Sequence, residues 1–407
     1  MTAKQWRTPL VVLVCAGLIL TLSTGTRAGF GLFLNPMSME LGWGRETYSF
    51  AMAIQNLFWG LGTPLAGMIA DRWGAGKVIF CGALMYAAGV MLMPEATTGW
   101  QLTLSGGVLI GLAQSCTTFA TVFGVLGRAY PPEKRSMVLG IGSAAGSFGQ
   151  FAILPYAQTL VSAFGWHTAL LFISFTVALI APLAFALVER AAAPARADEA
   201  RQSAMQALRE AMTHKGFLLL IAGYFVCGFQ LSFITIHFPA YVADLGFSAN
   251  VAVTALALVG LFNIAGSFMS GALGQHHPKQ YLLSAIYFGR AFITVLFILI
   301  PTSPATIYIF GATVGLLWLA TVPLTSGLIA QMFGVAWMST LTGIAVLTHQ
   351  LGSFLGVWLG GILYDRTGSY NVVWWLSIGL GVLAGLVNLP IDGRPIVRAR
   401  SSAPQPA

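Results

Sequence analysis

Residues 9–34 read PLVVLVCAGLILTLSTGTRAGFGLFL, and this stretch decides the class of the fold. It contains a single charged residue, Arg27. A helix of about 20 mostly apolar residues is long enough to cross the hydrocarbon core of a bilayer. The stretch therefore predicts a transmembrane helix that carries a positive charge. It is too long for the apolar core of a signal peptide, so we expect it to be retained.

The rest of the chain has the same character, with 57% hydrophobic and only 8% charged residues in total. Apolar runs of membrane-spanning length recur along all of it. These runs lie at about 9–34, 47–70, 78–94, 101–127, 137–162, 167–188, 217–241, 250–273, 280–300, 305–331, 337–362 and 371–390. The sequence thus predicts an all-α membrane protein with twelve transmembrane helices.

Basic residues gather in alternate loops. If the N-terminus is cytoplasmic, all but four of the 20 Lys and Arg residues lie inside; Arg45 and Arg366 lie outside, and Arg27 and Arg290 lie within spans. The positive-inside rule then predicts a protein of the inner (cytoplasmic) membrane with both termini in the cytoplasm. The same bias explains the net charge of +8, so we expect no nucleic-acid partner. The four cysteines lie in spans without the spacing of metal ligands, so we expect no metal.

The chain also repeats itself at an offset of about 203 residues. Gly25 aligns with Gly228, and Gly149 aligns with Gly352. We therefore expect an N-terminal six-helix bundle at 1–188, a cytoplasmic linker at 189–216, and a C-terminal six-helix bundle at 217–407 with a short cytoplasmic tail. Met205 to Met212 in the linker could form a short amphipathic helix. Parallel repeats of this kind place a substrate site between the halves, near the membrane midplane.

The loop after the second span reads Gly67-Met-Ile-Ala-Asp71-Arg72-Trp-Gly74-Ala-Gly76-Lys77. This loop resembles the G-x-x-x-D-R-x-G motif of the major facilitator superfamily. The resemblance implies the major facilitator fold of two parallel six-helix repeats, here expected as a monomer in the lipid bilayer. It also implies that Gly67, Asp71, Arg72, Gly74 and Lys77 act in gating. A second copy of the pattern at 361–368 falls outside by span parity, and we interpret it as a capped turn and not as a gate.

Two further segments resemble the oxalate:formate antiporter and monocarboxylate porter branch of that superfamily. They are residues 26–33 with the following Leu41-Gly42-Trp43, and residues 352–361. The resemblance implies a mono- or dicarboxylate substrate. The chain departs from the oxalate carriers at His349, where they use Lys, and at Asn263 in a span that carries no Arg.

All twelve acidic residues fall in loops or at span ends, so the charge inside the membrane is positive and favours an anionic substrate. Arg27 is the first candidate for the anion anchor, because a guanidinium can hold a carboxylate through two parallel hydrogen bonds. The alternative is an arginine that reaches outward to the interface. The other candidate substrate contacts are Gln114, Thr117, Gln230, Arg290, Trp318, His349 and Gln350.

Several of these candidates could have a role in packing or helix hydrogen bonding instead of substrate binding. Gln230 is the repeat mate of Arg27, and we expect the two to approach each other. Thr117 belongs to a stripe on one helical face that could line a cavity, but buried threonines often bond to carbonyls of their own helix. Arg290 could instead contact a neighbouring carbonyl, and His349 could be a packing residue.

The sequence therefore predicts a secondary transporter that moves a small organic anion by alternating access. Protons are a second candidate partner, through His349 or His237 or carried on the substrate itself. The alternative function is a proton-linked exporter of drugs or neutral solutes, which more typically carries a carboxylate inside the membrane. No phosphate-binding loop or nucleophile–base pair is present, so we expect neither an enzyme nor a cofactor.

Overall fold

The computed structural model describes residues 7–130, 132–188, 204–334 and 338–396. These residues form helices and contain no strand. The first part of the chain has α1 (Pro9–Gly29), α2 (Leu34–Glu40), α3 (Arg45–Trp73), α4 (Ala75–Leu92), α5 (Gly99–Leu102), α6 (Ile110–Thr117), α7 (Phe119–Ala129), α8 (Pro132–Ala178) and α9 (Ile180–Ala184). The second part has α10 (Ala204–Thr213), α11 (Lys215–Asp244), α12 (Ala249–His276), α13 (Lys279–Leu299), α14 (Pro304–Leu317), α15 (Thr321–Phe333), α16 (Met338–Thr367) and α17 (Asn371–Asn388).

These helices account for the predicted spans. Ten helical segments of the described chain are long and apolar enough to cross a membrane. One of them, Ile141–Leu187, covers two predicted spans and bends at Gly165, whose φ is 76°. The remaining predicted span, 47–70, is the 29-residue helix α3, which at 1.5 Å per residue is about 44 Å long. The predicted all-α membrane fold is confirmed.

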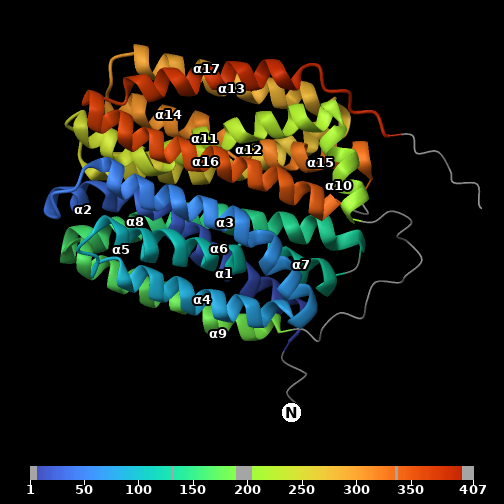
Figure 1. Cartoon of the computed structure of the whole chain (residues 1–407), viewed down its shortest axis with the longest axis horizontal. Helices are drawn as coiled ribbons and strands as arrows, with labels where there is room; N and C mark the ends of the chain where they lie inside the picture. The colour runs from blue at the N-terminus through green and yellow to red at the C-terminus, as the bar shows by residue number, and fades with distance from the viewer. Residues whose placement is uncertain (1–6, 131, 189–203, 335–337, 397–407) are drawn as a thin grey trace, which may run out of the picture.

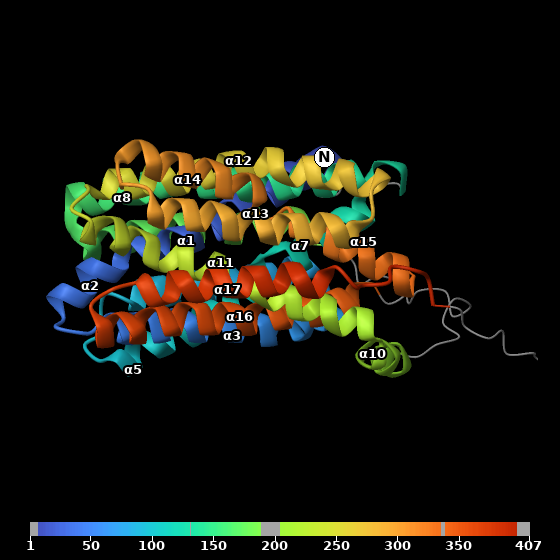
Figure 2. The ribbon, with the colours of Figure 1, turned by 90° about the horizontal axis from the view of Figure 1, so that it is seen from above.

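The long helices form two groups that lie side by side. Helices α1 to α9 occupy the lower part of Figure 1, and α11 to α17 occupy the upper part. The groups meet where α3 packs against α16 and where α8 packs against α12. Figure 2 shows α2 and α5 at one end of the molecule and α10 at the other. We call these ends the Arg45 face, where α3 begins, and the Lys77 face, where α4 begins.

The internal repeat appears as two matching helix crossings. A Cβ added to Gly149 of α8 would collide with the backbone of Thr21 on α1, and one added to Gly352 of α16 would collide with the backbone of Phe225 on α11. Both crossings therefore require glycine, as expected for small residues that let membrane helices approach closely. Each crossing joins the first and fifth spans of its own half.

Two long spans are broken at matching positions. Between α6 and α7, Thr118 has φ −103° and ψ −168°. In the second half, α14 ends at Leu317 and α15 begins at Thr321. Backbone N–H and C=O groups that lose their helical hydrogen bonds inside a membrane must find other partners in the protein. We therefore expect side chains near both breaks to form hydrogen bonds there.

The predicted short helix at Met205 to Met212 is confirmed as α10, which lies at the Lys77 face. The preceding linker residues, 189–203, lie outside the described chain.

Candidate functional site

Arg27 lies in the last turn of α1, with its side chain turned into the protein. Its Nη2 donates a hydrogen bond of 2.7 Å to Oδ1 of Asn56 on α3. The guanidinium also lies over the ring of Trp59, 4.7 Å from the ring centroid. Its buried Nε has no hydrogen-bond partner among the described residues. The alternative of an arginine that reaches outward to the interface is therefore wrong.

Trp59 and Asn56 are themselves held in place. The indole Nε1 of Trp59 donates a 3.1 Å hydrogen bond to Oγ1 of Thr118, the residue at the break between α6 and α7. Asn56 donates from Nδ2 to the carbonyl of Met52 at 3.0 Å, and this orients its Oδ1 toward Arg27. Trp59 was missed from the sequence, although it lies three residues after Asn56 and so on the same helical face.

Gln114 and Thr117 lie inside the first bundle, next to this cluster. Gln114 donates from Nε2 to the hydroxyl of Tyr86 at 3.3 Å. The hydroxyl of Thr117 donates to the carbonyl of Ala113 at 3.1 Å and lies 3.0 Å from the hydroxyl of Ser23 on α1. Both residues are completely buried. For Thr117 the structure thus shows the alternative, a hydroxyl bonded to its own helix, and its contact with Ser23 joins α6 to α1 one turn before Arg27.

His349 and Gln350 lie near the middle of α16. Nδ1 of His349 is 3.0 Å from Oε1 of Gln350, and its ring stands 4.9 Å from that of Tyr224. Gln350 is buried, and its Nε2 has no hydrogen-bond partner among the described residues. Gln350 packs against Gly60, where an added Cβ would stand 2.8 Å from the Gln350 Cβ. Because Gly60 is one turn beyond Asn56, polar groups of both bundles lie along one stretch of the α3–α16 contact.

Arg290 and Trp318 meet at the break between α14 and α15, where Arg290 donates hydrogen bonds to free backbone carbonyls. The guanidinium of Arg290 donates to the carbonyl of Leu317 at 2.6 and 3.1 Å, to the carbonyl of Trp318 at 2.6 Å, and to Sγ of Cys227 at 3.3 Å. Arg290 is buried, and its donors satisfy carbonyls left free at the end of α14. The structural alternative, a contact to a neighbouring carbonyl, is what the structure shows for Arg290.

Gln230 forms no hydrogen bond with Arg27 among the described residues, so the structure does not show the expected pairing. Its Nε2 donates to the carbonyl of Ser377 on α17 at 3.0 Å, inside the second bundle. There it lines a small cavity together with Arg290 and Trp318. The repeat relation fixes the position of Gln230 on its helix, but its uncharged amide finds a carbonyl partner within its own bundle.

The predicted gating loop lies at the Lys77 face. Gly74 separates α3 from α4 with φ 95°, a conformation that favours glycine. Gly67 borders open space, and Lys77 is exposed. The side chains of Asp71 and Arg72 lie outside the described part of the structure, so their gating role stays a prediction.

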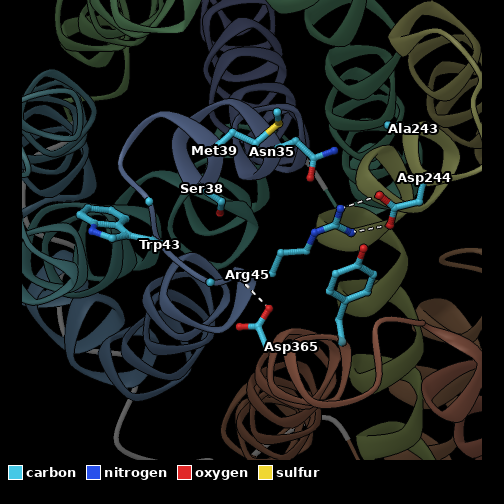
Figure 3. Close-up of a pocket in the computed structure, with 11 residues that line it drawn as sticks. Asn35, Ser38, Met39, Trp43, Arg45, Ala243, Asp244 and Asp365 are labelled. Carbon is cyan, nitrogen blue, oxygen red and sulfur yellow. Dashed lines mark hydrogen bonds and ion pairs between the residues drawn. The ribbon is translucent and has the colours of Figure 1, made fainter.

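A charged cluster at the opposite face was not predicted (Figure 3). Arg45 of α3 donates to both carboxylate oxygens of Asp244 at the end of α11, at 2.6 and 2.7 Å. The carboxylate of Asp365, at the end of α16, accepts hydrogen bonds from the backbone N–H groups of Arg45 and Glu46. We call Arg45, Asp244 and Asp365 the Arg45 lock. It borders a cavity of about 510 Å³.

The lock corrects the interpretation of residues 361–368. We expected a capped turn, yet Asp365 caps a helix of the other bundle, 320 residues away in sequence. Span parity gives the side of the membrane but not the helix end that lies opposite, so the sequence did not reveal this partner.

Known proteins resemble the chain over most of its length. It is 26% identical to monocarboxylate transporter 13 of Rattus norvegicus over 84% of this chain and 78% of that protein. It is 22% identical to the MFS-type transporter YcxA of Bacillus subtilis, over 89% of this chain and 90% of that protein.

Solved structures show the same fold. The D-xylose-proton symporter superposes with a TM-score of 0.72 at 16% identity, over 95% of this chain and 99% of that one. A bacterial homolog of the human lysosomal transporter Spinster superposes with a TM-score of 0.74 at 15% identity, over 93% of this chain and 95% of that one.

The sequence profile of the Major Facilitator Superfamily matches residues 14–357. That match covers most of the first bundle and the second bundle as far as the middle of α16. The family and the relatives above are transporters and not enzymes. The chain belongs to the Major Facilitator Superfamily.

Proposed function

We propose that this transporter carries a small organic anion, a mono- or dicarboxylate, across the cytoplasmic membrane by alternating access. The observation that carries the proposal is the burial and hydrogen bonding of Arg27. Its guanidinium lies inside the protein, bonded to neutral Asn56, while its buried Nε has no partner. No carboxylate pairs with Arg27 among the described residues. A charge in that setting is suited to an anionic ligand.

The second bundle offers a donor of its own. Nε2 of Gln350 is buried and has no partner among the described residues, and it belongs to the helix that packs against α3 near Asn56. A carboxylate held by Arg27 on one side and by Gln350 on the other would link the two bundles. Such a link gives the ligand different contacts in open and closed states, as alternating access requires.

His349 and Trp59 complete the proposed substrate site. His349 adjoins Gln350, and histidine can exchange a proton near neutral pH, which makes it the candidate for proton coupling. The ring of Trp59 supports the guanidinium. Gln114, Thr117, Gln230, Arg290 and Trp318 have partners within their own bundles, so we assign them supporting roles behind the site.

Several curated relatives are named monocarboxylate transporters, and this agrees in chemistry with an arginine anchor. We further propose that both termini face the cytoplasm, because the excess of Lys and Arg then lies inside. In that orientation the Arg45 face is external, and the loop at 67–77 is the cytoplasmic gate.

The proposal is tested by counterflow in proteoliposomes that contain the purified protein. Vesicles preloaded with unlabelled pyruvate, lactate, oxalate or succinate receive the same labelled anion outside, with and without a pH gradient. We expect at least one of these carboxylates to exchange. Failure of every carboxylate, with exchange of a cationic or neutral solute by the same protein, would favour the exporter alternative.

A further inference from the structure

The first turn of α3 lacks a cap from its own chain segment. Its N-cap residue is Gly44, which provides no side-chain hydrogen bond. The N–H groups of Arg45 and Glu46 donate instead to Oδ1 and Oδ2 of Asp365, at 3.0 and 2.8 Å. The free N–H groups and dipole of a helix N-terminus favour a negative charge there. A carboxylate of the second bundle therefore completes a helix of the first.

Other contacts of the Arg45 lock also join the two bundles. The guanidinium of Arg45 forms a bidentate pair with Asp244, a geometry that makes charged hydrogen bonds strong. It also lies 3.8 Å from the ring centroid of Tyr364 and donates to the hydroxyl of Tyr370 at 3.0 Å. Gly44 fits closely beneath Asp365, because an added Cβ would collide with that carboxylate.

The α3–α16 pair carries the same sequence pattern at both ends. The two helices run in opposite directions, so α16 ends at the Arg45 face, where α3 begins. Residues 67–74 close α3 and residues 361–368 close α16, each with the pattern G-x-x-x-D-R-x-G. Both patterns end in a glycine of positive φ, 95° at Gly74 and 68° at Gly368. Each aspartate thus stands at the end of one helix, on the face where the other helix begins.

The two ends of this pair differ in packing. At mid-length Gly60 touches Gln350, but two turns further toward the Lys77 face, on the same helical faces, Gly67 and Gly343 border open space. At the Arg45 face, by contrast, Gly361 packs against Ser49. Among the described residues, the α3–α16 contact is therefore close from the Arg45 face to mid-length, whereas these two glycines beyond it have no neighbour of the other bundle.

We propose that residues 361–368 form a second latch, which holds the Arg45 face closed by capping α3 with Asp365. It competes with the loop at 67–74, whose Asp71 would hold the Lys77 face closed in the opposite state. Opening of the Arg45 face requires release of the Asp365 cap and of the Arg45–Asp244 pair. This latch extends the alternating access proposed above, but its test needs no substrate, so the two proposals can fail separately.

Spin labels at two exposed positions of the Arg45 face measure its opening. Trp100→Cys and Asn250→Cys place one label in each bundle, in a variant whose four native cysteines are replaced by alanine. Double electron–electron resonance then gives the ratio of long to short distances. We expect Asp365→Asn to raise this open-to-closed ratio about tenfold, on the order of the effect of losing a helix cap. Gly44→Ala should open the face as well, because it displaces the carboxylate.

The matched control is Arg366→Gln, next to Asp365 and exposed, which should change the ratio less than about twofold. The decisive variant combines Asp71→Asn with Asp365→Asn. It weakens both latches, so we expect the ratio to return toward that of the parent, an effect that simple loss of stability would not produce. The proposal is overturned if Asp365→Asn and Gly44→Ala both leave the ratio within twofold of the parent, or if Asp71→Asn does not reverse the effect of Asp365→Asn.

Discussion

The substitution Arg27→Gln separates the charge of the proposed anchor from its hydrogen bonding. A glutamine keeps an uncharged amide donor on the side of α1 that faces Asn56, although its side chain is shorter than the one whose Nη2 makes the 2.7 Å bond. We therefore expect the variant to fold and to melt within a few degrees of the parent protein. What it cannot provide is the positive charge and the free Nε.

The expected loss follows from the burial of that charge. Removing one partner of a desolvated, hydrogen-bonded charge pair costs about 2–5 kcal/mol. At about 1.4 kcal/mol for each factor of ten, the dissociation constant of a carboxylate should rise roughly 30-fold to a few thousand-fold. The dissociation constant of Arg27→Lys should lie between those of the parent protein and Arg27→Gln, because an ammonium keeps the charge but lacks the planar fork of a guanidinium.

Equilibrium binding of a labelled carboxylate that exchanges in the counterflow assay measures this loss. The matched control is Arg7→Gln, which removes an arginine that lies outside the spans. If Arg27→Gln is folded and binds the carboxylate within about threefold of the parent protein, Arg27 is not the anchor and the reasoning fails.

Three other substitutions test the supporting structure. Arg290→Leu should lower the melting temperature by several degrees, because it frees the carbonyls of Leu317 and Trp318 at about 1–3 kcal/mol each; an unchanged melting temperature would contradict its role at the break. Trp59→Phe keeps a ring beneath Arg27 but loses the bond to Thr118, so carboxylate affinity should fall only about 3- to 10-fold, and a loss as large as that of Arg27→Gln would show a direct role for the indole N–H. His349→Gln should flatten the pH dependence of uptake while preserving exchange at fixed pH; a parental pH profile in this variant would leave His349 as a packing residue.

Hydropathy predicts most of this fold because the bilayer limits what a segment can do. Runs such as 9–34 are too apolar for any other environment, and every predicted span is matched by a helix. The repeat offset likewise predicts pairs of positions with equal packing, as Gly149 and Gly352 show.

Side-chain direction was harder to predict. Gln230 occupies the repeat position of Arg27, but rotation about its side-chain bonds brings it to Ser377 in its own bundle. The repeat predicts where a residue lies on its helix, but it does not predict which neighbour its polar atoms bond to. The mid-span placement of Arg290 suggested a substrate contact, whereas the break in the neighbouring helix created carbonyls that need its donors.

Long-range partners were the least accessible to sequence reasoning. The pattern at 361–368 can be read directly, but Asp365 acts on N–H groups 320 positions away. Backbone N–H groups are the same for nearly every residue type, so the sequence does not show which of them bind a carboxylate. The need for glycine at position 44 becomes clear only when the adjacent carboxylate of Asp365 is known.

The proposed transport depends on recognition of the negative charge of a carboxylate by Arg27. The most direct test compares lactate with lactamide, which has nearly the same shape and no charge, as competitors of labelled lactate uptake into proteoliposomes. We predict that unlabelled lactate competes, that lactamide does not compete at a concentration 100-fold higher, and that Arg27→Gln abolishes the uptake. Equal competition by lactate and lactamide, with uptake retained by Arg27→Gln, would contradict the account.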